Sequence, residues 1–114
     1  MYSNNFPYKR FRITIEFVKK HIQQNELILD LGIDNPMSKI MKENGFKVIN
    51  TSGEDLDFNQ SCVIQTNATV VTAFQIFEHL LNPFQVLREI KSEKLVCSVP
   101  LRLWFSSAYK NNND

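Results

Sequence analysis

Four short apolar runs, separated by helix-like or polar segments, most constrain how this chain can fold. They are "ELILDL" at 26–31, "FKVIN" at 46–50, "ATVVTA" at 68–73 and "KLVCSV" at 94–99. Their length and their β-branched residues indicate buried strands. Strands that alternate with helices need crossover connections, which make the strands parallel. We therefore expect an α/β fold: a doubly wound, mostly parallel Rossmann-like sheet of about four strands, with helices on both faces.

Three segments carry a helical pattern. Residues 9–24 place apolar residues on one stripe of a helix. A second helix should begin at Pro36 after the N-cap Asn35 and end near Gly45. The segment "NPFQVLREI" at 82–90 repeats the Asn-Pro start. The side chains expected to face the sheet are Phe11, Ile15, Val18, Ile22, Met37, Ile40, Met41, Phe84, Val86, Leu87 and Ile90.

The length of 114 residues fits one domain. We divide it into an N-terminal segment and helix at 1–24, a core at 25–100 and a tail at 101–114. Leu101, Leu103, Trp104 and Phe105 lie in the tail, and no later segment of the chain follows to cover them. Because the fourth strand would also be a sheet edge, we expect self-association through the C-terminal part, or a missing C-terminal segment.

The net charge of +1 gives no overall attraction to an acidic or basic partner. Basic residues do gather in the first helix, and we interpret them as a solvated face, so nucleic-acid binding is not expected. The start of the chain lacks a signal-peptide pattern, and no apolar run is long enough to span a membrane. We therefore expect a cytoplasmic protein without a membrane partner.

The two cysteines predict neither a disulfide framework nor a metal site. Cys62 and Cys97 lie far apart in the sequence and form no paired motif. With His21 and His79 they could supply four zinc ligands, but the paired spacing of zinc sites is missing. Cys97 lies inside an apolar run, so we expect a buried, reduced thiol there.

Ligands of doubly wound sheets bind beyond the carboxyl ends of the strands, where the strand order reverses. Three segments directly follow strands here: "GIDN" at 32–35, "NTSGEDLD" at 50–57 and "FQIFEHL" at 74–80. These segments are where we look for binding and catalytic residues.

The same segments resemble the class I S-adenosylmethionine-dependent methyltransferases, especially small bacterial methyltransferase-domain proteins. "ILDLG" is similar to the first family motif, and "FEHLLNPFQVLREI" to the segment after the fourth family strand. "LVCSVP" is similar to the next strand of the family. The resemblance covers residues 25–100. It implies S-adenosyl-L-methionine as cofactor and transfer of a methyl group to an acceptor that the sequence does not identify.

The chain also departs from the family pattern. Gly32 is the only glycine left in the first loop, and Asn50 and Thr51 stand where the family usually has an acid. A further helix and strand of the family have no room in residues 52–68. The resembled fold has seven strands, whereas this sequence predicts four, so the chain would be truncated or degenerate as an enzyme.

The resemblance assigns cofactor contacts to residues that follow the strands. Gly32 would allow backbone to approach the ligand, and the helix that starts at Pro36 would offer amide groups to a carboxylate. Asp34 would repel a pyrophosphate. A structural turn with a good helix cap is the alternative for this loop. The cofactor-binding candidates are Asp30, Gly32, Ile33, Asp34, Asn50, Thr51, Asp55, Leu56, Phe74 and Gln75.

Two groups of titratable residues leave alternatives open. One carboxylate of Glu54, Asp55 and Asp57 would accept hydrogen bonds from the cofactor, with Leu56 and Phe58 beside adenine, or all three would be ordinary solvated acids. Glu78 and His79 are the catalytic candidates.

For Glu78 and His79 we favour a structural role at the turn before Asn82, with Glu78 capping backbone amides, because methyl transfer depends mainly on positioning.

Two other functions compete with a methyltransferase. A nicotinamide-nucleotide-binding protein would share the fold, but the missing glycines and the neutral Asn50 count against it. A non-catalytic interaction domain could keep the fold without a cofactor.

Overall fold

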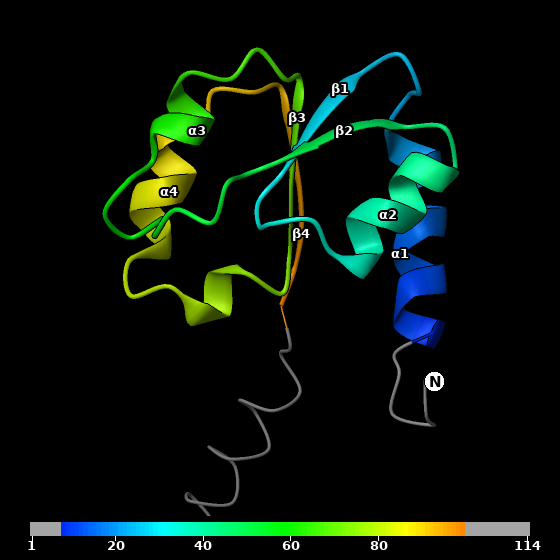
Figure 1. The fold of residues 1–114 in the computed structure, drawn as a ribbon, viewed down its shortest axis with the longest axis horizontal. Coiled ribbons are helices and arrows are strands. Elements are labelled where there is room, and N and C mark those ends of the chain that lie inside the picture. The colour runs from blue at the N-terminus through cyan, green and yellow to red at the C-terminus, as the bar shows by residue number, and fades with distance from the viewer. Residues whose placement is uncertain (1–7, 100–114) are drawn as a thin grey trace, which may run out of the picture.

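The computed structural model describes residues 8–99 and shows a parallel sheet between two layers of helices (Figure 1). The elements along the chain are α1 (Tyr8–His21), β1 (Leu27–Asp30), α2 (Pro36–Glu43), β2 (Lys47–Asn50), α3 (Ser61–Ile64), β3 (Val70–Phe74), the 3-10 turn η1 (Phe77–His79), α4 (Pro83–Glu89) and β4 (Lys94–Ser98). This architecture is a Rossmann-like α/β fold and confirms the expected fold class.

In the strand order β2-β1-β3-β4, the strands that follow β1 in the sequence lie on both sides of it, so the strand order reverses between β1 and β3. All three strand pairs are parallel, with Leu29 beside both Ile49 of β2 and Val71 of β3. From β1 the chain moves outward to β2, and it then returns to place β3 on the other side of β1. The carboxyl ends of β1 and β3 therefore flank a topological switch point, the usual ligand position in such sheets.

The two sheet faces are covered by separate hydrophobic clusters, as alternation along the strands requires. Ile28 and Val70 point to the face covered by α1 and α2, where they join Val18 and Met41. The other face carries α3 and α4, and Figure 1 shows these two helix pairs on opposite sides of the sheet. The expected stripe of α1 is confirmed, with Ile15, Val18 and Ile22 buried and Phe11 packed against them.

Asn35 starts α2 as expected. Its side chain accepts a hydrogen bond from the Ser38 amide at 2.9 Å, and the Asn35 backbone amide donates in return to the Ser38 hydroxyl at 3.0 Å, which completes a capping box. Pro36 occupies the first turn. Gly45 follows with a positive φ of 93°, a conformation that glycine adopts without strain.

Three side chains that were expected to be buried are exposed: Phe84, Leu87 and Cys97. In α4 the helix turns Val86 and Ile90 toward the sheet, as expected, and this orientation leaves Phe84 and Leu87 on the outer side. Cys97 is exposed, since β4 is an edge strand whose alternate residues are left uncovered. The sequence also gave no sign of the single-turn helix α3. The expectations for residues 101–114 lie outside the described residues.

Candidate functional site

A cavity of about 320 Å³ lies at the switch point. Its walls come from the end of β1 and the loop into α2, from the end of β3, from one residue of β4 and from the first half of α1. The lining residues are Arg10, Phe11, Thr14, Asp30, Leu31, Gly32, Ile33, Asn35, Pro36, Met37, Phe74, Gln75, Ile76 and Ser98. Five of the expected cofactor-binding residues thus line one cavity: Asp30, Gly32, Ile33, Phe74 and Gln75.

Asp30 forms the floor of this region and is almost completely buried. Its carboxylate accepts hydrogen bonds from the Thr72 hydroxyl at 2.7 Å, the Asn35 side-chain amide at 2.9 Å and the Asn50 side-chain amide at 3.2 Å. Burial raises the pKa of Asp30 above its ordinary value, and the hydrogen bonds, with that of Thr72 first, oppose the increase. The carboxylate therefore ties β1 to β2, to β3 and to the cap of α2.

The raised pKa of Asp30 predicts how stability changes with pH. Above the ordinary pKa of 3.8 the folded state keeps a proton that the unfolded state has lost. This contribution is present below pH 3.8 and is lost as the pH rises through the folded-state pKa. We expect Asp30→Asn to remove it, so urea unfolding at a series of pH values should show the variant gaining stability relative to wild type over that window.

Asp34→Asn is the control for this pH effect. The hydrogen bond from Ser38, and after it the charge of Lys42, lowers the pKa of Asp34, so its contribution to stability changes with pH in the direction opposite to that of Asp30. A wild-type minus Asp30→Asn difference that is flat between acid and neutral pH would contradict the assignment.

The loop after β1 is held by hydrogen bonds to Asn50 and Thr51 at the end of β2. The Gly32 amide donates to the Thr51 hydroxyl at 2.8 Å, and the Gly32 carbonyl accepts from the Asn50 side chain and the Thr51 amide. Gly32 has φ of 124°, which strains any other residue, although the neighbouring side chains would leave room for a Cβ atom. A substitution at Gly32 would therefore disturb the backbone conformation of the loop, and a loss of ligand binding in such a variant would not identify a ligand contact.

The start of α2 offers less to an anion than expected. Pro36 has no amide hydrogen. The Ser38 amide already donates to the Asn35 side chain, and the Lys39 amide already donates to the Asn35 carbonyl. Of the first-turn amides, that of Met37 has no acceptor within residues 8–99, and Met37 is also one of the residues that line the cavity.

Gln75 is held in an unusual conformation at the cavity wall. It is the only non-glycine residue in the described range with positive φ, at 62°. Its amide donates to the Ser98 carbonyl at 2.9 Å, and its side-chain amide donates to the Ser98 hydroxyl at 3.1 Å. Strained residues of this type concentrate at binding sites. The contact with Ser98 leaves the Gln75 side-chain oxygen as an acceptor.

The expected contacts from β2 and the acidic loop lie elsewhere. Asn50 and Thr51 bind the β1–α2 loop and do not line the cavity. Asp34 lies on the solvent side, 3.5 Å from Lys42.

In the acidic loop, Leu56 belongs to the core cluster on the α3–α4 face, whereas Phe58 is exposed. Asp55 accepts the Asp57 amide. Asp57 in turn accepts the amides of Leu81 and Asn82 at 3.0 and 2.8 Å.

Asp57 thus caps the backbone amides at the turn before α4, the role that we expected for Glu78. Glu78 forms no hydrogen bond to a backbone amide in the described part of the chain, and its Oε1 atom is buried without a partner. Its other oxygen lies 3.7 Å from His79, whose side chain is largely exposed. Neither residue lines the cavity, so the geometry gives no support to a catalytic role for this pair.

The structure adds cavity residues that sequence reasoning did not select. They are Arg10, Phe11 and Thr14 from α1, Leu31, Asn35, Pro36 and Met37 around the first loop, and Ile76 and Ser98 at the ends of β3 and β4. The Arg10 guanidinium lies 5.7 Å from the centre of the Phe11 ring. Among residues 8–99, Arg10 is the one cationic side chain in the lining.

Residues 8–99 contain neither a candidate metal centre nor a membrane-spanning helix. No cluster of three or more His, Cys, Asp or Glu side chains is arranged to hold a metal ion. No helix in this range has the length and apolar character needed to cross a membrane. Comparisons of the chain with models of protein families, with curated proteins and with solved structures find no match.

Proposed function

We propose that this domain binds S-adenosylmethionine in the switch-point cavity and is of the methyltransferase type. The observation that carries the proposal is the position of the cavity, at the ends of the two strands whose following segments resemble the family motifs. The acceptor of the methyl group is not part of the proposal, because no described residue indicates its chemistry.

The lining suits a ligand that is apolar in the middle and charged at one end. Phe11, Met37 and Phe74 provide apolar walls. Arg10 could pair with a carboxylate, and the free oxygen of Gln75 could accept from an ammonium or amino group. The volume of about 320 Å³ is at the small end of ligand pockets, which fits the methionyl end of the cofactor better than the whole molecule.

Bound S-adenosylmethionine would supply an electrophilic methyl group, and the protein residues would have to orient it. The described cavity has no histidine, and its one carboxylate, Asp30, is occupied by three protein donors. Placing acceptor and methyl group in line is therefore the contribution that this site can make to a reaction.

The two rival functions predict different binding. A nicotinamide dinucleotide needs a site for its pyrophosphate, but Thr51 and Asn35 occupy the Gly32 and Ser38 amides that could have bound it. A non-catalytic interaction domain would bind neither compound.

Isothermal titration with S-adenosylhomocysteine and with NAD tests the proposal. We expect S-adenosylhomocysteine to bind the wild-type chain with measurable heat and NAD not to bind. Binding of NAD alone would replace the proposal with the dinucleotide function, and binding of neither compound would favour an interaction domain.

A further inference from the structure

The outer face of α1 combines exposed apolar and basic side chains. Ile13 and Phe17 are 57% and 51% exposed, and they lie one turn apart. Lys9 and His21 extend the same row at four-residue spacing. The adjacent row carries Arg12, Glu16 and Lys20. We name the face formed by these seven residues the α1 face.

The α1 face has a strong excess of positive charge. Three of its residues, Lys9, Arg12 and Lys20, are exposed and basic, and Glu16 is its single acid. Lys19 adds another exposed cation at the end of the helix. Charge on this face therefore differs from the near-neutral balance of the whole chain. A partner would have to be anionic and to accept two apolar side chains.

A hollow of about 470 Å³ continues this surface at the C-terminal end of α1. Lys19, Lys20 and His21 line it together with glutamine and apolar side chains, and within residues 8–99 none of the lining residues is acidic. Lys94 donates to the His21 carbonyl at 3.1 Å, but the same ammonium group lies 3.0 Å from the Glu26 carboxylate, which also accepts the Gln23 amide. This acid and the helix carbonyls offset part of the positive charge around the hollow, so the preference for an anionic partner comes from the exposed lysine and arginine side chains of α1.

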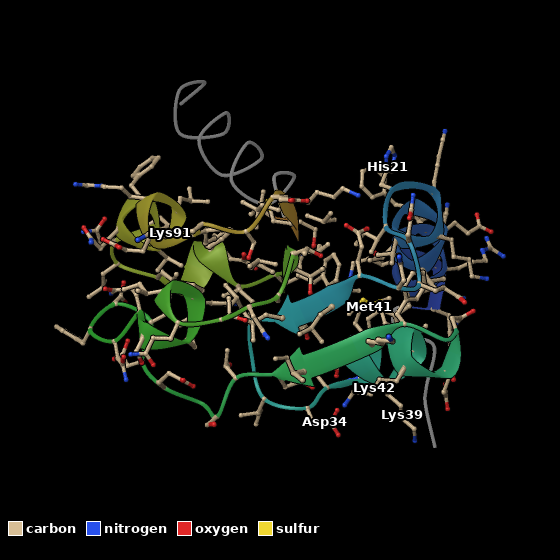
Figure 2. The ribbon with its side chains drawn as sticks, turned by 90° about the horizontal axis from the view of Figure 1, so that it is seen from above. His21, Asp34, Lys39, Met41, Lys42 and Lys91 are labelled. Atoms are coloured by element: carbon tan, nitrogen blue, oxygen red, sulfur yellow. The ribbon has the colours of Figure 1, made fainter. Side chains whose placement is uncertain are left out.

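The position of α1 favours a flat partner. Figure 1 places α1 at the outside of its layer, and Figure 2 shows its side chains spreading away from the sheet. The apolar pair sits on a helix ridge instead of in a groove, whereas peptides usually bind in grooves or at strand edges. Interfacial helices place apolar side chains at the boundary of headgroups and acyl chains and keep their lysine and arginine side chains among the headgroups. The main apolar face of α1 is buried against the sheet, so Ile13 and Phe17 are the side chains that α1 offers for this contact.

We propose that the α1 face docks onto an anionic lipid surface. Ile13 and Phe17 enter the headgroup boundary, and the surrounding lysine and arginine side chains contact lipid phosphates and carboxylates. The sequence led us to expect a solvated face and no membrane partner; the exposure of two large apolar side chains among these cations is what changes that expectation. The proposal is independent of what the cavity binds.

Vesicle co-sedimentation of the full chain tests this docking. Wild type should sediment with phosphatidylcholine vesicles that contain about one third phosphatidylserine, should not sediment with pure phosphatidylcholine, and should be released by salt. Phe17→Ser should lower the partition coefficient about tenfold. Lys20→Gln should lower it about fivefold.

Two matched controls lie away from α1. Phe84→Ser removes an equally large exposed side chain of α4, on the other face of the sheet, and Lys91→Gln removes an exposed lysine on that side (Figure 2). Both should partition like wild type, and circular dichroism melting should show all variants folded. Equal binding to neutral vesicles, no binding at low salt, or a wild-type value for Phe17→Ser would overturn the proposal. Salt-sensitive binding to RNA or polyglutamate without binding to vesicles would also overturn it.

Discussion

Replacing Asp30 with alanine is expected to lower the free energy of unfolding by about 3 kcal/mol. The carboxylate is the shared acceptor of three side chains from β3, β2 and the cap of α2. Its loss would leave the fully buried Thr72 hydroxyl without its partner and open a small space between the strands. The cost of burying the charge, visible in its raised pKa, works in the opposite direction but does not replace the missing acceptor.

Asp34→Ala is the matched control, because Asp34 lies four residues later and its side chain is 75% exposed. Surface ion pairs contribute little, so the urea midpoint of this variant should stay close to that of wild type. Urea denaturation of both variants at neutral pH provides the comparison. Similar midpoints for Asp30→Ala and wild type would mean that the three-way contact does not hold the switch point together.

The parts of the fold that follow local rules could be predicted from the sequence. Asn35 and Pro36 start a helix by satisfying or omitting amides of the first turn, and the structure shows both effects. The central strands are buried on both faces, so their apolar runs gave a clear signal. The positions of the ligand segments at the ends of β1 and β3 then followed from parallel topology.

The errors arose where two apolar patterns compete. In α4, Val86 and Ile90 form one row, and Phe84 and Leu87 form another; only packing against the sheet chose the first. We expected Cys97 to be buried because it lies in an apolar run, but only alternate residues of this edge strand are covered by other parts of the protein. Spacing along the sequence therefore does not decide which row of α4 is buried or whether Cys97 is covered.

The site was predicted only in part because one of its walls comes from α1, whose position depends on tertiary packing. The residues of α1 precede the first strand, so no crossover rule fixes where Arg10 and Thr14 lie relative to the cavity. In the same way, the register that pairs Asp30 with Asn50 and Thr72 turns an expected ligand contact into an internal hydrogen bond.

Filling the cavity from α1 is expected to abolish binding of S-adenosylhomocysteine. Thr14 lines the cavity, and its hydroxyl makes only a local bond to the Arg10 carbonyl at 2.8 Å. In Thr14→Trp a large side chain would occupy the space that the ligand needs, while β1, β3 and their loops remain intact. The affinity measured by isothermal titration should fall by about 100-fold or more, equivalent to about 2.7 kcal/mol.

Ile13→Trp provides the control on the same helix. Ile13 is exposed and does not line the cavity, so this variant carries the same new side chain without filling the site. It should bind S-adenosylhomocysteine as wild type does, and the two variants should melt within a few degrees of each other. Equal affinities for the two tryptophan variants would place the ligand outside the switch-point cavity, because a tryptophan at a position that lines the cavity could not leave a ligand there undisturbed.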